Sequence, residues 1–139
     1  MRDGGRADVD VLVVDDDLRV RQALVRLLTA WPGFRVVGEA GDAEAAVRSA
    51  EERHPTVALV DVLLPDADTG LGLIDALSHE IGAPVIAISA QSSVRGAALS
   101  AGAVSFVDKG ISPELLVGVL VEAANESPGG RPGPTTQTF

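Results

Sequence analysis

The chain has 139 residues, 46% of them hydrophobic, a size and composition that suit one domain with a buried core and exclude a disordered chain. Its formal net charge of −9 excludes a segment that itself grips a nucleic-acid backbone, because such binding needs clustered Lys and Arg. The absence of cysteine excludes disulfides, and no apolar run approaches the ~20 residues that span a bilayer, so we expect cytoplasmic localisation and no membrane partner.

Short apolar runs alternate with longer amphipathic stretches along the chain. The runs are short enough for buried parallel strands, which we predict over residues 9–14, 35–38, 57–60, 84–88 and 104–107. The amphipathic stretches predict helices over residues 18–30, 42–53, 70–79, 92–101 and 113–124. Asp42 is a suitable N-cap for the second helix, and Ser112 and Pro113 suit the start of the last one. This alternation predicts an α/β domain over residues 9–125, with helices on both faces of a parallel sheet.

Two terminal segments do not follow the alternation. Residues 1–8 contain no predicted element, and we expect a flexible N-terminus. Residues 126–139 are rich in Pro and Gly, which indicates a loose tail or a truncated linker.

Carboxylates close two of the predicted strands. Asp15, Asp16 and Asp17 follow the first strand, and Asp61 follows the buried part of the third. The carboxyl edge of an open α/β sheet is where ligands bind, and a carboxylate cluster there repels itself unless it holds a cation such as Mg²⁺. A single Asp in this position more often caps a helix, which is our interpretation of Asp17. Acids at two strand ends favour a metal site.

Two further strand ends carry groups suited to phosphate chemistry. Lys109 follows the fifth strand, where an ammonium can pair with a carboxylate or a phosphoryl oxygen. Ser89 ends the fourth strand beside the small residue Ala90, and its hydroxyl can donate to a phosphoryl oxygen. A solvated Lys and a Ser that caps a turn are the ordinary alternatives, and the two residues alone leave them open.

Taken in order, Asp15-Asp16, Asp61, Pro65, Ser89-Ala90 and Lys109 resemble the receiver domain of bacterial two-component response regulators. The resemblance covers residues 9–125, and residues 32–42 are similar to the NarL/FixJ subfamily. It implies a flavodoxin-like, five-stranded parallel sheet of strand order 2-1-3-4-5, with five helices distributed over both faces.

The resemblance also implies a role for each matched residue. Asp61 would accept a phosphoryl group from a phosphohistidine of a sensor histidine kinase, and Lys109 and Ser89 would contact that group. Mg²⁺ would be bound by Asp15, Asp16, Asp61 and the backbone carbonyl of Leu63. Ser89 and Phe106 would form the switch that reports phosphorylation, although Phe106 suits an ordinary core position equally well.

An output and a self-association surface follow from the same resemblance. Members of the subfamily usually continue into a helix-turn-helix domain, so DNA would be contacted only through an output domain missing from this chain. A homodimer would form through the fourth helix, the fifth strand and the fifth helix. The fifth helix is apolar nearly all round, which suits a partner surface or deeper burial equally. With only its own phosphorylation and dephosphorylation to catalyse, the domain would be a signalling protein rather than a turnover enzyme.

Two alternatives remain open on the sequence. The segment after Asp61 departs from the family pattern, since it carries the additional acids Asp66 and Asp68 and its Gly70 lies one position late. We interpret both acids as solvated loop residues, but the departure keeps a degenerate receiver, acting as an interaction module without phosphate, as one alternative. The other is a haloacid-dehalogenase-like phosphatase with Asp15 as its nucleophile.

Overall fold

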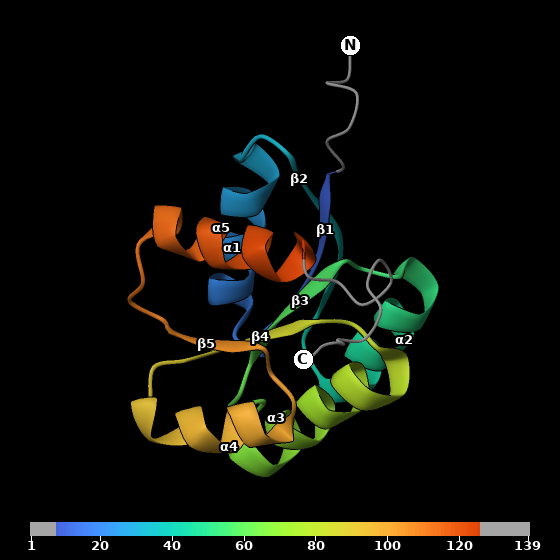
Figure 1. Cartoon of the computed structure of the whole chain (residues 1–139), viewed down its shortest axis with the longest axis vertical. Coiled ribbons are helices and arrows are strands. Elements are labelled where there is room, and N and C mark those ends of the chain that lie inside the picture. Colours follow the sequence, from blue (N-terminus) through green and yellow to red (C-terminus); the bar gives the residue numbers. More distant parts are fainter. Residues whose placement is uncertain (1–7, 126–139) are drawn as a thin grey trace, which may run out of the picture.

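The computed structural model describes residues 8–125 of the chain. Its five strands form one parallel sheet in the order β2-β1-β3-β4-β5 (Figure 1), which confirms the predicted fold class and strand order. The strands are β1 (Val9–Val14), β2 (Phe34–Ala40), β3 (Val57–Asp61), β4 (Val85–Ser89) and β5 (Ser105–Asp108). Nearly all of the predicted N-terminal segment, and all of the predicted tail over 126–139, lie outside the described residues, and the domain boundaries stay a prediction.

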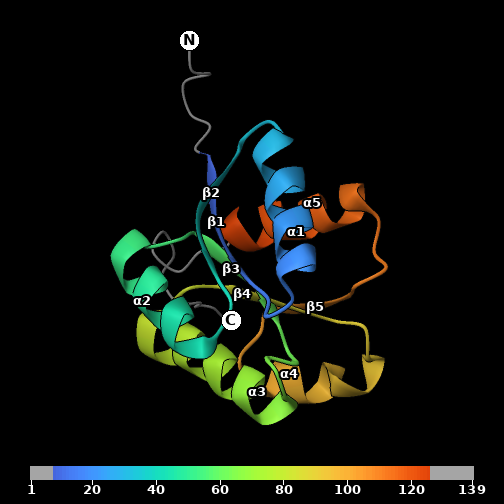
Figure 2. The same cartoon turned by 180° about the vertical axis from the view of Figure 1, so that it is seen from behind.

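Five α-helices cover the sheet. They are α1 (Leu18–Ala30), α2 (Ala43–Arg53), α3 (Ala67–Asp75), α4 (Arg95–Ala101) and α5 (Pro113–Asn125). A π-helical segment, η1 (Ala76–Ile81), continues α3, and a 3₁₀ turn, η2 (Ser92–Val94), precedes α4. Helices α1 and α5 lie on one face, while α2, α3 and α4 lie on the other (Figures 1 and 2). Within the described residues, none of these helices is long and apolar enough to cross a membrane.

The alternation of side chains along each strand divides the core into two layers. Along β1, Val11 and Val13 pack under α1 and α5, whereas Leu12 and Val14 pack under the other three helices. Every residue of β3 and β4 is buried, which agrees with their unbroken apolar runs. The core therefore fixes the central strands rigidly, and with them the residues at their carboxyl ends.

The third helix begins at Ala67, so the predicted range 70–79 started too late. Asp66, which we had interpreted as a solvated loop residue, is the N-cap: its carboxylate accepts a hydrogen bond from the Thr69 amide at 2.9 Å. Asp68 lies in the first helical turn. Acids at these positions stabilise the orphan amides of a helix N-terminus, so the sequence between Pro65 and Gly70 starts a helix.

Gly70 explains how α3 lies so close to β3. A Cβ atom at Gly70 would collide with the backbone carbonyl of Val62. Glycine is therefore required by close packing behind Asp61, and its place in the sequence does not mark a loop.

The starts of α4 and α5 can be compared with the predicted helix ranges. Helix α4 has α-helical geometry only from Arg95 onward, since residues 92–94 form the 3₁₀ turn. Helix α5 starts at Pro113 as predicted, and the Ser112 hydroxyl accepts from the Leu115 amide at 3.3 Å. It buries Leu116, Val117, Leu120 and Ala123 and leaves Leu115 64% exposed, so most of its apolar surface is used inside the domain.

Candidate functional site

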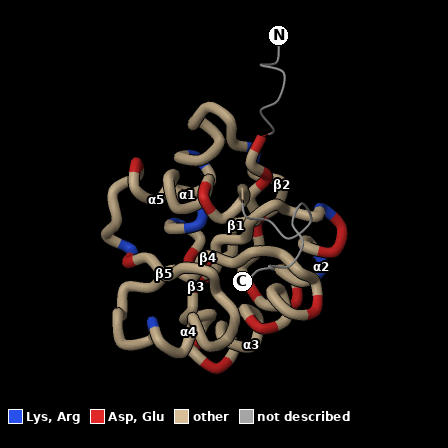
Figure 3. The backbone as a smooth tube through the Cα atoms, in the orientation of Figure 1, with Lys and Arg blue, Asp and Glu red and all other residues tan. Residues whose placement is uncertain are grey.

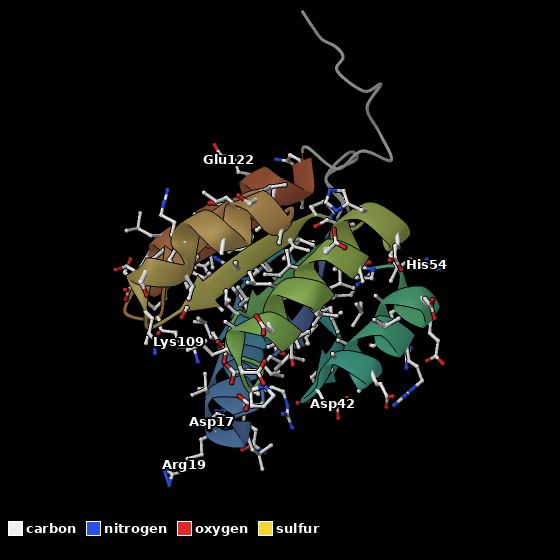
Figure 4. The ribbon with its side chains drawn as sticks, turned by 90° about the horizontal axis from the view of Figure 1, so that it is seen from below. Asp17, Arg19, Asp42, His54, Lys109 and Glu122 are labelled. Carbon is white, nitrogen blue, oxygen red and sulfur yellow. The ribbon has the colours of Figure 1, made fainter. Side chains whose placement is uncertain are left out.

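The carboxyl ends of four neighbouring strands bring the predicted site residues to one edge of the sheet. Asp15 directly follows β1, Asp61 ends β3, Ser89 ends β4 and Lys109 directly follows β5. Asp15 and Asp61 are 0% and 4% exposed, and Ser89 is also buried, whereas Asp16 is exposed. In Figure 4, Lys109 and Asp17 lie on this side of the molecule, and Glu122, late in α5, lies away from them.

Lys109 links the two buried carboxylates. Its ammonium lies 3.1 Å from Asp15 Oδ2 and 3.2 Å from Asp61 Oδ2. The Lys109 amide donates to the Ser89 carbonyl at 3.0 Å, which ties the β5 end to the β4 end. One cation thus faces two carboxylates in a site with little access to solvent, so the pair of acids is only partly neutralised.

The remaining oxygens of the two carboxylates differ in their partners. Asp15 Oδ1 accepts from the Asp17 amide at 2.9 Å, and Asp61 Oδ1 accepts from the Leu63 amide at 3.2 Å. Asp15 Oδ2, by contrast, is buried and lies 3.1 Å from the Lys109 ammonium, but within the described residues no donor meets it in hydrogen-bonding geometry. A buried carboxylate oxygen whose neighbouring ammonium is shared with a second carboxylate is incompletely satisfied, and a further cation would complete its neutralisation.

Carboxylate oxygens of Asp15, Asp16 and Asp61 lie within 4.8 Å of one another. Three converging carboxylates, neutralised only in part by one lysine, are a donor set that fits a hard divalent cation such as Mg²⁺. The acidic character extends over the surface: the chain has 20 acidic and 11 basic residues, and acids occur along α2 and α3 (Figure 3).

Burial and charge shift the pKa values at this edge. Burial and the neighbouring Asp15 carboxylate raise the pKa of Asp61, while Lys109 and the Leu63 amide oppose that rise. Burial acts to lower the pKa of Lys109, but its contacts with Asp15 and Asp61 outweigh burial and raise it. Lys109 therefore stays a cation at neutral pH, and the Asp61 carboxylate lies in a place that favours a further positive charge.

The predicted switch residues lie close to this cluster in the sheet. The Ser89 hydroxyl accepts from the Gln91 amide at 3.0 Å, and Ser89 pairs in register with Asp108, next to Lys109. Phe106 is 8% exposed and packs in the core, with the Arg95 guanidinium 5.8 Å from its ring centroid. Ser89 thus contacts the segment before α4, and Phe106 contacts the first residue of α4.

Sequence reasoning missed one contact to the cluster. Arg21, in α1, donates from Nη1 to the Asp15 carbonyl at 2.8 Å. Its Nε also pairs with Glu39, at the end of β2, at 3.0 Å. The 3.6-residue periodicity of α1 places Arg21 off the apolar stripe, but no sequence pattern shows which backbone carbonyl its side chain reaches.

Comparisons with known proteins agree with this geometry. The chain is 40% identical over 106 residues to protein-glutamate methylesterase/protein-glutamine glutaminase 3 of Myxococcus xanthus, covering 73% of this chain and 30% of that protein. It is 41% identical over 106 residues to protein-glutamate methylesterase/protein-glutamine glutaminase 1 of Xanthomonas campestris, covering 73% and 29%. The chain therefore spans about a third of the length of these curated relatives.

Solved structures of signalling domains have the same fold. The signal receiver domain of the response regulator NarL from Mycobacterium tuberculosis is 31% identical, with a TM-score of 0.75 and coverage of 86% of this chain and 98% of that one. The response regulator domain of Thermotoga maritima CheB is 28% identical, with a TM-score of 0.72 and coverage of 90% and 99%. A family model described as the response regulator receiver domain matches residues 11–121. With the match over most of its length, the chain belongs to the response regulator receiver domain family.

Proposed function

We propose that Asp61 accepts a phosphoryl group from a sensor histidine kinase in a Mg²⁺-dependent reaction. The observation that carries this proposal is the position of Asp61 between a protonated lysine and an acidic cluster. Its Oδ2 lies 3.2 Å from Lys109, and its carboxylate converges with those of Asp15 and Asp16. Receiver domains are signalling modules that act between histidine kinases and output domains, and this site has the groups that such a transfer needs.

The chemistry is a displacement at phosphorus. A carboxylate oxygen of Asp61 forms a bond to phosphorus as the P–N bond of the donor phosphohistidine breaks, and the imidazole nitrogen keeps that electron pair. A carboxylate is a weak nucleophile, so catalysis lies in positioning and charge neutralisation. Lys109 pairs with a phosphoryl oxygen, and the Ser89 hydroxyl turns from the Gln91 amide to donate to another.

Mg²⁺ would be held by Asp15, Asp16, Asp61 and the backbone carbonyl of Leu63. The three convergent carboxylates, and the single lysine that is shared between Asp15 and Asp61, support this assignment. When bound, the ion supplies neutralisation of the negative charge on the phosphoryl oxygens. The protein holds the carboxylates close together before the ion arrives, and Lys109 limits their repulsion.

Asp61 suits the nucleophile better than Asp15 does. Asp15 is 0% exposed and Asp61 is 4% exposed, and Asp61 is the more accessible of the two acids that Lys109 contacts. Membership of the receiver family also separates the chain from the haloacid-dehalogenase-like phosphatases, in which Asp15 would be the nucleophile. The intact cluster argues against a degenerate receiver.

Phosphorylation would change the region around α4. The phosphoryl group adds about −1.5 to −2 of charge and strong acceptors beside Ser89 and Lys109. Movement of Ser89 would open space toward Phe106, whose ring is now in the core under Arg95. Helix α4 has seven residues after a 3₁₀ turn, so few hydrogen bonds oppose its movement.

Two output classes compete. The resemblance to the NarL/FixJ subfamily favours a DNA-binding output, whereas the curated relatives are protein-glutamate methylesterases. Sequencing the gene beyond the Phe139 codon distinguishes the two classes. A helix-turn-helix segment there would favour a DNA-binding output, and a large enzymatic domain would favour a methylesterase. Self-association through α4, β5 and α5 is supported by Leu99, Val104 and Leu115, which are 39%, 54% and 64% exposed. Sedimentation of the phosphorylated and unphosphorylated chain tests it.

Intact-mass spectrometry after incubation with acetyl phosphate and Mg²⁺ tests the central proposal. Wild type is compared with Asp61→Asn, Asp15→Asn and the charge-matched control Asp68→Asn, whose site lies in the exposed first turn of α3. We expect one phosphoryl adduct in wild type and in Asp68→Asn, and none in Asp61→Asn or after Mg²⁺ is chelated. An adduct that persists in Asp61→Asn and is lost in Asp15→Asn would identify Asp15 as the nucleophile. A folded wild type without any adduct would support the degenerate receiver.

A further inference from the structure

Asp15 is held at the backbone as well as at its carboxylate. Its amide donates to the Ala40 carbonyl at 3.1 Å, and its own carbonyl accepts from Arg21 Nη1 at 2.8 Å. That carbonyl belongs to the peptide unit that joins Asp15 to Asp16. Because a peptide unit is planar and rotates as a whole, a bond to its oxygen fixes the direction in which Asp16 leaves the strand.

The Arg21 guanidinium is itself fixed from two sides. Its Nε pairs with Glu39 Oε1 at 3.0 Å, and its side chain is only 17% exposed. A Cβ atom at Gly41 would lie 2.7 Å from Nη1, so the turn between β2 and α2 leaves room for the guanidinium. Arginine suits this position because its planar fork offers donors in two directions at once.

We propose that Arg21 is a positioning residue for the metal site, acting by clamping the peptide unit between Asp15 and Asp16. This inference rests on the proposed function, because it assigns Arg21 a part in the same Mg²⁺ site. The clamp joins α1, the β1 end and the β2 end, and it requires the absence of a side chain at Gly41. Arg21 does not touch the reacting atoms and is not a catalytic residue.

The direction in which the Mg²⁺ affinity changes in Arg21→Ala distinguishes a positioning role of Arg21 from an effect of its charge alone. Removal of a cation from beside an acidic cluster lessens its repulsion of Mg²⁺, so charge alone predicts tighter binding in Arg21→Ala. Loss of the clamp predicts weaker binding, because the carboxylates are then less well placed before the ion arrives. The two explanations therefore give opposite results in one titration.

The experiment is calorimetric titration of Mg²⁺ into the metal-free chain. We expect Arg21→Ala to bind Mg²⁺ about tenfold more weakly than wild type, which is the usual loss for a residue that orients metal ligands. Arg19→Ala removes the same charge from an exposed position of α1 and is expected to bind as wild type or slightly more tightly. Unchanged or tighter binding by Arg21→Ala would overturn the inference.

Gly41→Ala displaces the guanidinium without any change of charge. The three atoms nearest to the new Cβ all belong to the end of the flexible Arg21 side chain, so the fold should accept it. We expect weaker Mg²⁺ binding in the same direction as Arg21→Ala, and no further loss when both changes are combined. Independent, additive losses would contradict a shared clamp.

Amide hydrogen exchange of the metal-free chain supplies a readout without metal. The Asp17 amide, which donates to Asp15 Oδ1 at 2.9 Å, should exchange faster in Arg21→Ala and Gly41→Ala than in wild type or Arg19→Ala. Equal exchange in all four proteins would overturn the clamp. If the wild-type chain binds no Mg²⁺, the proposed metal site is overturned, and the inference with it. If wild type binds Mg²⁺ and Arg21→Ala binds it equally well, the inference alone is overturned.

Discussion

The two edges of the sheet each carry an acid and a base, and they use them differently. At the amino edge, Asp10 accepts two hydrogen bonds from Arg35, at 2.9 and 3.1 Å. Arg35 is 62% exposed, and Thr56 satisfies both backbone groups of Asp10. At the carboxyl edge, one lysine is shared between two buried aspartates, at 3.1 and 3.2 Å. The charged groups at the amino edge are paired with each other and accessible to water, whereas those at the carboxyl edge have an excess of negative charge.

This difference shows where the fold accepts a cost in stability. An exposed bidentate pair contributes little, because water screens it, but it leaves no group unsatisfied. A buried cluster with too few cations destabilises the folded chain and at the same time prepares it to bind a cation or a phosphoryl group with its lysine. The following predictions test that contrast, from the largest expected effect to the smallest.

Gly70→Ala should destabilise the carboxyl edge most, by about 3 kcal/mol, because the new methyl group collides with the Val62 carbonyl and forces α3 away from β3. Gly72→Ala is the matched control two positions along the same helix. Nothing lies within 4 Å of a Cβ there, so it should be neutral or stabilising by up to about 1 kcal/mol. Urea unfolding measures both, and equal effects would refute the close packing.

Lys109→Met should cost roughly 2 kcal/mol in metal-free protein, because it leaves two buried carboxylates without their cation. Arg35→Met breaks the corresponding pair at the amino edge and should cost less than about 0.5 kcal/mol, since that pair is exposed. Denaturant titration of both variants in the presence of a chelator makes the comparison. If Lys109→Met and Arg35→Met lost similar amounts of unfolding free energy, burial would not explain the difference between the two edges.

Asp61→Asn should have the opposite sign and stabilise the metal-free chain at neutral pH, on the order of 1 kcal/mol. Folding raises the pKa of Asp61, chiefly through burial, so the protonated form is favoured in the folded state. The Asp61 contribution is therefore fully present below the ordinary aspartate pKa of about 3.9 and is lost as pH rises through the raised value. The advantage of Asn over Asp should shrink as the pH is lowered.

Thermal unfolding with and without Mg²⁺ completes that measurement. Mg²⁺ should raise the Tm of wild type and leave that of Asp61→Asn nearly unchanged, since the variant has lost one of the convergent carboxylates. An Asp61→Asn protein that is less stable than metal-free wild type at neutral pH would show that the acid cluster costs nothing.

Asp66→Ala should give the smallest loss, a modest decrease in Tm, because it removes the N-cap of α3. The backbone hydrogen bond from Thr69 lowers the pKa of Asp66, so the cap contributes above the pKa of an unfolded aspartate and is lost as the pH falls through the lowered value. Asp66→Asn, which can cap without charge, serves as the control. A Tm difference between Asp66→Ala and wild type that does not narrow in acid would argue against a capping carboxylate.

The local helix starts show how far sequence reasoning reached. Asp17 and Asp42 were predicted as N-caps, and both accept hydrogen bonds from the first turn of the following helix. Asp66 has the same role, although the sequence analysis interprets it as a solvated loop residue of the segment that departs from the family pattern. Gly70 is a helical residue whose missing side chain matters only once the Val62 backbone, directly after β3, is known to lie against it. An N-cap contacts residues close to it in the sequence, whereas the need for glycine at position 70 comes from a contact with another segment of the chain.

The order of residues along the chain predicts a parallel sheet with helices on both faces, and it places Asp15, Asp61, Ser89 and Lys109 at strand ends. Buried parallel strands are short and apolar and end at the same edge of the sheet, whereas the strand order that makes these four ends neighbours is what the family resemblance implies. The packing of the elements, by contrast, is what places one lysine between both buried aspartates and brings Arg21 to the Asp15 carbonyl. Those contacts depend on how the elements lie against one another, and a hydrophobic period carries no information on that distance or angle.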